Sequence, residues 1–249
     1  MSHALPLVPA GLDCGLPHRL YTLARHSHMP ADSPLLPRKA PRQRRSQHTV
    51  ASLLEAAAQL LETQGLAGFT TNAVAERAGV SIGSLYQYFP SKDALTLALL
   101  QREAERFHAD ASAALAIPEG AAALRRLIEA AVRQQLERPE LARLLDEQEG
   151  RPELRAVLDK GRFSALIDRL LQRPDLPRQP DPALAVADLA ALIRGLVDGA
   201  GERRETNLLH LQRRVEAAAF GYLERVAQAA KAGQVPKCES DLRAGPHKA

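Results

Sequence analysis

The chain of 249 residues contains no tryptophan and only two cysteines, Cys14 and Cys238, which lie near its opposite ends. Two cysteines so far apart match no metal-site spacing, so we expect neither a disulfide framework nor a metal site, in a reducing compartment. No run of about 18 apolar residues occurs, so no membrane span is predicted. The beginning of the chain lacks basic residues and is interrupted by Pro, Gly and Asp13, so we expect no signal peptide and a cytoplasmic protein.

Signatures of strands and of common enzymes are missing as well. No useful length of the chain alternates with period two, which predicts an all-α protein. The sequence has no nucleophile elbow, no phosphate-binding glycine loop and no HExxH motif. Asp146, Glu147 and Glu149 form an acidic group, but neighbouring acids on a helix point in different directions and are typical of a solvated face. We expect no enzyme and no cofactor, and a helical enzyme remains the less favoured alternative.

Basic residues are concentrated before residue 46. Five of them lie within eight positions that contain no acid, namely Arg38, Lys39, Arg42, Arg44 and Arg45. The net charge is +4 and the sequence pI is about 9.3. A cluster this dense favours contact with a polyanion, most simply nucleic acid, and a solvated basic linker is the alternative interpretation.

Composition and helical patterning together divide the chain into four parts. We predict a disordered N-terminal extension with a basic arm over 1–45, a first helical domain over 46–107, a larger helical domain over 108–232, and a disordered tail over 233–249. Met29 is the only methionine after Met1. We therefore hypothesise that the native chain starts at Met29 and that residues 1–28 are not part of it.

The domain predicted over 46–107 has the pattern of a helix-turn-helix, a motif typical of DNA-binding domains. Apolar residues recur at helical spacing from Ser46 to Gly65, followed by two short helical runs and a long helix from Ser91. Thr70 or Thr71 is placed to cap the first short helix and Ser81 the second. Gly79 lies between the short helices, where a left-handed residue lets the chain turn steeply.

The remainder of the chain is predicted to be helical throughout. Prolines and glycines divide it into helices of roughly 121–138, 140–149, 152–173, 183–203 and 208–231. The segment 183–203 is apolar on more than one face, which indicates either a buried central helix or a helix shared with a twin subunit. For the second alternative we expect a four-helix bundle that uses Val186, Leu189, Ile193, Leu196, Val215, Ala219 and Tyr222.

The stretch TTNAVAERAGVSIGSLYQYFPSKDAL resembles the DNA-binding signature of TetR-type (TetR/AcrR) transcriptional regulators, and the resemblance covers about 48–107. It implies an all-helical homodimer that binds a double-stranded DNA operator and releases it when a small molecule enters the C-terminal domain. Carried onto this sequence, it implies base or groove contacts from Asn72, Ile82, Gly83 and Tyr86, phosphate contacts from Thr71, Ser84, Tyr88 and Lys92, and either kind from Gln87. Ser81 lies on the same outer face, and Arg42, Arg44 and Arg45 resemble a flexible arm.

The resemblance does not identify the effector, and two functions remain open. The first is a repressor released by an apolar or amphipathic ligand, because the C-terminal helices carry mainly Leu, Ile, Val and Ala. The second is a constitutive DNA-binding regulator with no effector. Candidate residues for orienting a ligand are Gln134, Gln148, Arg155 and Phe163. The sequence does not record whether the protein represses or activates, because that depends on where the operator lies.

Overall fold

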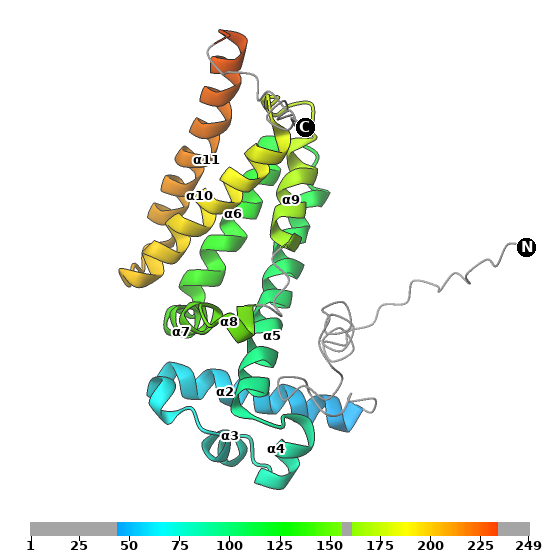
Figure 1. Ribbon diagram of the computed structural model, residues 1–249, viewed down its shortest axis with the longest axis vertical. Coiled ribbons are helices and arrows are strands. Elements are labelled where there is room, and N and C mark those ends of the chain that lie inside the picture. Colours follow the sequence, from blue (N-terminus) through cyan, green and yellow to red (C-terminus); the bar gives the residue numbers. More distant parts are fainter. Residues whose placement is uncertain (1–43, 156–160, 234–249) are drawn as a thin grey trace, which may run out of the picture. The chain divides into compact units, whose positions relative to one another are not determined.

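The structure is a computed structural model that describes residues 44–155 and 161–233. Within these ranges every regular element is a helix and no strand occurs, so the expected all-α class is confirmed. Figure 1 shows the helices in chain order. They are α2 (Arg44–Gly68), α3 (Thr71–Arg77), α4 (Ile82–Tyr88), α5 (Lys92–Ser112), the 3-10 helix η1 (Ala113–Ala116), α6 (Gly120–Glu137), α7 (Pro139–Glu149), α8 (Pro152–Arg155), α9 (Gly161–Leu171), α10 (Pro182–Glu202) and α11 (Leu208–Lys231).

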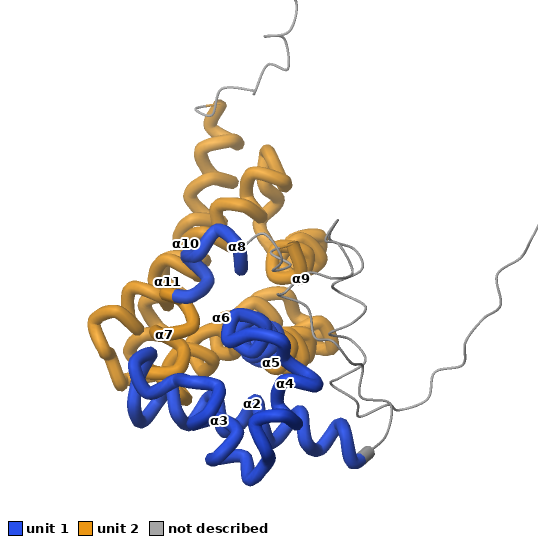
Figure 2. Tube along the Cα trace, turned by 60° about the horizontal axis from the view of Figure 1, so that its bottom comes forward, with its two compact units in different colours: residues 1–103, 148–158 blue, residues 104–147, 159–249 orange. Residues whose placement is uncertain are grey.

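The chain divides into two compact units, coloured separately in Figure 2. Unit 1 comprises residues 1–103 and 148–158, and unit 2 comprises residues 104–147 and 159–249. The helix α5 therefore begins in unit 1 and ends in unit 2. The short helix α8 belongs to unit 1, although most of α7 and all of α9 belong to unit 2. No described helix is long and apolar enough to cross a membrane.

Unit 1 is built around α2 and the helix pair α3 and α4. The apolar stripe of α2 predicted from the sequence is buried, with Leu53 and Ala57 fully enclosed. The helix continues to Gly68 rather than stopping at Gly65, but Gly65 has a left-handed φ of 63° that marks a kink at the predicted end. Phe69 and Phe89 are about 1% exposed and complete the core of the unit, which confirms the structural role expected of large apolar side chains here.

The turn between α3 and α4 follows the local chemistry of its sequence. Thr70 caps α3, because its hydroxyl accepts a hydrogen bond from the backbone N–H of Ala73 at 3.1 Å. Ser81 caps α4 in the same way, by accepting from the N–H of Ser84 at 3.1 Å. Gly79 adopts φ of 68°, the left-handed conformation expected from the sequence.

Unit 2 has a core formed by α6, α9, α10 and α11. The fully buried side chains include Leu124 and Ile128 on α6, Ile167 on α9, and Leu189 on α10. Arg173, just beyond α9, donates hydrogen bonds to the carbonyls of Leu115, Ile117 and Pro118 in the turn before α6. The carboxylate of Asp175 accepts from the N–H of Gly120, the first residue of α6. The loop after α9 therefore fixes the turn that precedes α6.

Burial changes the interpretation of the residues assigned to a dimer contact. Leu189, Ile193, Val215 and Ala219 are at most 1% exposed, because they pack inside the core of their own subunit. The assignment of these four residues to a contact with a second subunit does not fit this burial. Val186, Leu196 and Tyr222 are partly accessible and pack against the same core.

The helix predicted over 152–173 is described at both of its ends. The structure has α8 at its beginning and α9 toward its end, and the residues between them, 156–160, lie outside the described ranges. Pro152 begins α8, as expected for a proline in a first helical turn. The two pieces are assigned to different units.

The left-handed turn at Gly79 yields a stability prediction. A Cβ at this position meets no atom within 4 Å, so the cost of Gly79→Ala is that of the backbone conformation alone, about 1–2 kcal/mol of unfolding free energy. Gly79→Asn is the matched variant, and we expect it to cost less because asparagine tolerates this conformation. Urea denaturation followed by circular dichroism measures both variants. Equal losses for Ala and Asn would contradict the backbone explanation.

Candidate nucleic-acid interface

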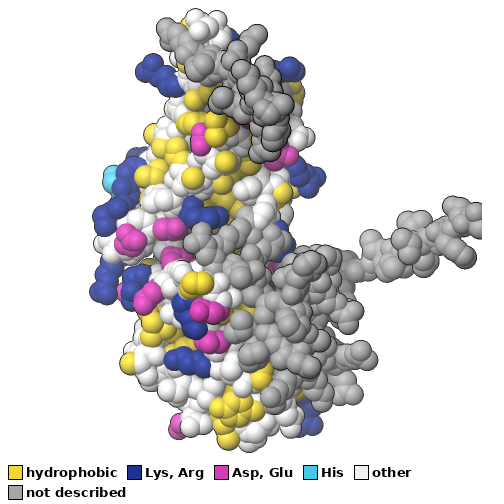
Figure 3. Space-filling view, viewed as in Figure 1, with side chains coloured by type: hydrophobic (Ala, Val, Ile, Leu, Met, Phe, Trp, Pro, Cys, Tyr) yellow, Lys and Arg dark blue, Asp and Glu magenta, His cyan; other side chains and the backbone are white. Residues whose placement is uncertain are grey.

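The helices α3 and α4 present most of the predicted DNA-contacting residues on one outer surface of unit 1. Val74 and Ala75 on α3 and Leu85 on α4 face inward and are buried. Ile82 and Tyr86 face outward and are 38% and 42% exposed, although both carry large apolar groups. Figure 3 shows an apolar patch at the lower tip of unit 1, in the region of α3 and α4.

Two hydroxyls from different helices meet at this surface. The Thr71 Oγ1 and the Tyr86 Oη lie 3.2 Å apart, within hydrogen-bond distance, and either one can be the donor. Thr71 is available for this contact because Thr70, not Thr71, caps α3. The contact orients the Tyr86 ring, and the pair retains one hydroxyl proton for an acceptor on another molecule. A phosphate oxygen is such an acceptor.

The beginning of α4 is shaped for close approach. The Ser81 and Ser84 hydroxyls lie 2.9 Å apart beside the capping bond. A Cβ placed on Gly83 meets only the Ser81 hydroxyl, at 3.9 Å, so the backbone is open to another molecule at this point. Gln87 is exposed on the same short helix, and Tyr88 is half-buried.

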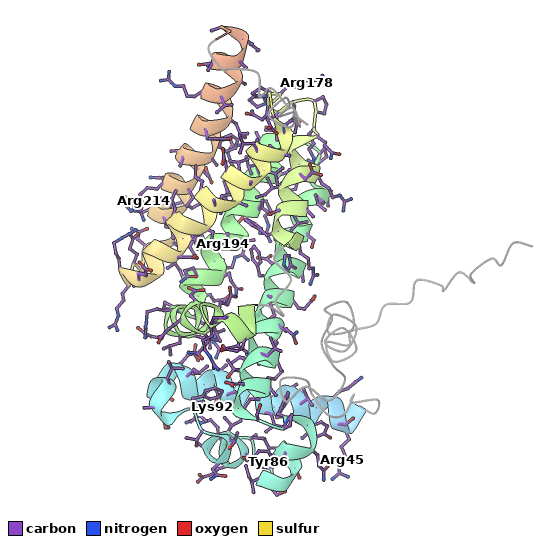
Figure 4. The ribbon with its side chains drawn as sticks, viewed as in Figure 1. Arg45, Tyr86, Lys92, Arg178, Arg194 and Arg214 are labelled. Carbon is purple, nitrogen blue, oxygen red and sulfur yellow. The ribbon has the colours of Figure 1, made fainter. Side chains whose placement is uncertain are left out.

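Polar and charged groups surround the apolar patch. Asn72 is exposed in the first turn of α3. Lys92 is exposed at the start of α5, with its Nζ 5.0 Å from the centre of the buried Phe69 ring. This cation–π contact holds the ammonium group over a ring that lies two residues before the start of α3. Figure 4 labels Tyr86, Lys92 and Arg45, all of which belong to unit 1.

The basic arm is described only at its end. Arg42 lies outside the described residues. Arg44 and Arg45 form the first turn of α2, so the helix begins two residues earlier than the predicted Ser46 and includes part of the expected flexible arm. The Arg45 side chain is exposed and projects from α2 toward the same lower edge of the view as Tyr86 (Figure 4).

The residues proposed to orient an effector do not form one group. Phe163 is 8% exposed in the core of unit 2, and its ring centre lies 5.5 Å from that of Phe107. Gln134 is half-buried on α6, whereas Gln148 belongs to unit 1 and accepts a hydrogen bond from Arg151 at 3.4 Å. The side chain of Arg155 lies outside what the structure describes.

The three acidic residues near the end of α7 differ in their surroundings. Asp146 accepts a hydrogen bond from the Gln135 amide at 3.2 Å, and its partial removal from water raises its pKa. Glu147 and Glu149 are exposed. Among the described residues, no three His, Cys, Asp or Glu side chains are grouped closely enough to hold a metal ion.

The part of the chain that contains α3 and α4 is similar in sequence to known regulatory proteins. Residues 53–99 match the model of the bacterial regulatory proteins of the tetR family. The HTH-type transcriptional repressor KstR of Rhodococcus jostii is 46% identical over 54 residues, which cover 22% of this chain and 26% of that protein. KstR of Mycolicibacterium smegmatis is 44% identical over 57 residues, which cover 23% of this chain and 28% of that protein. The alignments thus span about a quarter of each relative.

Solved structures extend the similarity to the whole fold. The fatty acid degradation regulator FadR from Bacillus halodurans aligns with a TM-score of 0.60 at 20% identity, over 69% of this chain and 97% of that one. A TetR-family regulator from Mesorhizobium loti aligns with the same TM-score at 18% identity, over 74% and 98% of the two chains. Residues 53–99 of this chain thus match the DNA-binding segment of the tetR family of bacterial regulatory proteins, and its fold is similar to that of regulators described as TetR-family proteins.

Proposed function

We propose that this protein is a sequence-specific DNA-binding repressor that acts as a homodimer and leaves its operator when a small molecule binds. The observation that carries the proposal is the exposed surface formed by Ile82, Tyr86 and Thr71 on a helix-turn-helix whose sequence matches the TetR family and the KstR repressors. Contiguous exposed apolar patches mark interaction sites, and a DNA groove covers both apolar and hydroxyl groups.

The chemistry of the surface divides the contacts into two kinds. The Thr71 and Tyr86 hydroxyls, Lys92 and Arg45 suit phosphate oxygens, which position the protein without reading sequence. Ile82 has no hydrogen-bonding side chain and would contact a thymine methyl. Asn72 and Gln87 carry the exposed amides that suit adenine edges. Because α4 itself offers few direct readers, part of the operator choice would come from DNA shape.

A dimer is needed to place two helix-turn-helix units in successive major grooves, about 34–36 Å apart. The outer face of α10 is the surface best suited to it. Leu184 is 55% exposed, Ala187 and Ala191 are exposed one and two turns further along, and a Cβ on Gly195 would meet no atom of the subunit. The three small residues Ala187, Ala191 and Gly195 allow a second helix to approach closely along this part of α10.

Tyr222 joins this face from α11. Its hydroxyl donates to the Asp188 carboxylate of α10 at 2.7 Å. Partial burial, together with the bond to Asp188, raises the pKa of Tyr222 to about 12, so the hydroxyl keeps its proton at neutral pH. The bond fixes α10 against α11 within the subunit, beside the face proposed to meet the partner.

The effector is proposed to bind in unit 2. Its core consists mainly of Leu, Ile, Val and Ala, with Phe163 buried in it and Phe107, Phe220 and Tyr222 partly buried against it, which favours an apolar or amphipathic ligand. The alternative is a constitutive regulator, in which unit 2 serves only association. The two functions differ in one observable, because only a ligand-released repressor loses operator affinity when its ligand is saturating.

The hydroxyl pair provides the direct test of the DNA-binding proposal. A duplex selected by the wild-type protein from a randomised library serves as operator, and mobility-shift titration measures affinity. We expect Tyr86→Phe and Thr71→Val each to weaken binding about 5- to 10-fold, the cost of one hydrogen bond to phosphate. Tyr86→Ala should reduce binding to the non-specific level. Thr63→Val is the control, because that exposed hydroxyl bonds only the carbonyl of Gln59. Unchanged affinity in Tyr86→Ala with an intact helical spectrum would refute the assignment.

Arg45 tests the electrostatic part of the interface. Arg45→Ala should weaken binding to all duplexes similarly and lower the slope of log affinity against log salt by about one, because one phosphate contact is lost. Arg178→Ala, an exposed residue of unit 2, removes the same charge and should leave the slope unchanged. An effect of Arg45→Ala on a single operator variant would indicate base reading instead.

Gly195 tests the dimer face. Gly195→Leu has room within the subunit, but it should weaken self-association at least about tenfold by overpacking the contact between subunits. Glu147→Leu adds the same side chain at an exposed position of α7 and should leave association unchanged. Analytical ultracentrifugation over a range of concentrations measures both. A dimer of wild-type strength in Gly195→Leu would place the interface elsewhere.

A further inference from the structure

The short segment 148–155 is part of unit 1 but is joined at both ends to unit 2. Residues 148–158 group with residues 1–103, whereas α7 up to Glu147 and α9 from Gly161 group with unit 2. Figure 2 shows α8 in the colour of unit 1. Among the described residues after α5, this segment is therefore the one stretch that belongs to unit 1, and it interrupts the chain of unit 2.

The segment is attached by both apolar and charged contacts. Leu154 is fully buried. The two terminal nitrogens of Arg151 donate to the two carboxylate oxygens of Asp93, at 2.7 and 3.0 Å. This paired geometry fixes the relative orientation of the two side chains as well as their distance. The hydrogen bond with Arg151 lowers the pKa of Asp93, so the carboxylate remains charged at neutral pH.

Arg151 is itself oriented by neighbouring residues of its segment. Its Nη1 donates to the Gln148 side chain at 3.4 Å, and its backbone N–H donates to the Gln148 carbonyl at 3.1 Å. Its Nε lies 4.0 Å from a carboxylate oxygen of Glu153. Contacts on both sides of the guanidinium therefore fix it to the segment, so a displacement of the segment would displace the group that Asp93 binds.

Asp93 lies just after the short connection between α4 and α5. It occupies the first turn of α5, beside Lys92 and two residues after Ser91, whose hydroxyl caps that helix by accepting from the Ala94 N–H at 3.0 Å. Phe89, which ends α4, is only four residues earlier. The Arg151–Asp93 pair therefore contacts the first turn of α5. The position of this turn determines where Lys92 and the C-terminal end of α4 lie.

Stability alone does not account for the pair. The Arg151 and Asp93 side chains are 37% and 40% exposed, and ion pairs exposed to this extent contribute little to unfolding free energy. Their geometric effect is larger, because the pair connects a segment continuous with unit 2 to the first turn of α5. We infer that residues 148–155 couple unit 2 to the DNA-binding surface, and that Arg151 is a positioning residue that acts through Asp93.

This inference rests on the proposed DNA-binding function, and operator affinity is its first test. With the duplex selected by the full-length wild-type protein, Arg151→Ala and Asp93→Asn should each weaken binding about three- to tenfold. The double variant should be no weaker than the worse single variant, because both substitutions remove one contact. The salt slope should stay at the wild-type value in Arg151→Ala, since Arg151 is proposed to touch no phosphate. Additive losses, or a reduced slope, would overturn the inference.

Arg143→Ala is the matched control. Arg143 bonds Glu140 within unit 2 at 3.2 Å, and these side chains are 32% and 41% exposed, close to the values for Arg151 and Asp93. It should bind the duplex as the wild type does. Arg151→Lys keeps the charge but loses the paired geometry, and an affinity between those of the wild type and Arg151→Ala is expected. Equal losses in Arg143→Ala and Arg151→Ala would reduce the effect to a general loss of stability and overturn the inference.

Amide hydrogen exchange separates this inference from the proposed function. In the free protein, Arg151→Ala should speed exchange over 85–95, and Arg143→Ala should not. In the wild type, binding of the selected duplex should slow exchange over 148–154, because coupling between two sites is reciprocal. Failure to select any duplex would refute the proposed function, and exchange in the free protein would still decide the coupling. Unchanged exchange in Arg151→Ala would refute the inference even if the protein binds its operator.

Discussion

The proposed DNA-reading surface depends on a single backbone conformation, the left-handed turn at Gly79. This turn directs α4 away from α3 so that Leu85 returns to the core beside Ala75 while Ile82 and Tyr86 face outward. The caps at Thr70 and Ser81 fix where the two helices begin, which determines which residues occupy the outer face. The close approach of the Thr71 and Tyr86 hydroxyls is a consequence of the same geometry, because the two residues belong to different helices and are 15 positions apart.

Much of unit 1 could be predicted from the sequence, because its elements begin and end at residues with strong local preferences. Ser81, Gly79 and Ser91 have the conformations and capping bonds that their types favour. The choice between Thr70 and Thr71 as the cap of α3 could not be made, since both side chains are suited to the bond. The start of α2 at Arg44 was also missed, because a basic run without acids is compatible with both a helix and a flexible arm.

Unit 2 was less predictable because its helices are apolar on several sides. Periodicity predicted that α10 is apolar on more than one face, but it could not separate the side chains that face the core from those that face outward. Leu189 and Ile193 were assigned to a partner and are buried in their own subunit, whereas Leu184 and Gly195 are on the accessible side. The Arg151–Asp93 pair was beyond sequence reasoning, because its members are 58 positions apart and neither belongs to a motif.

The outer face of α10 has a further consequence in a genome that encodes many related regulators. Subunits of similar fold must avoid forming mixed dimers, since a mixed dimer would read two unrelated half-sites. In the proposed dimer the contact is made by small side chains, so the shape of the surface, and not hydrogen bonding, determines which subunits fit. Substitutions at Ala187, Ala191 or Gly195 change that shape without entering the core that Leu189 and Ile193 fill. Partner choice can therefore diverge between duplicated copies while each copy still folds.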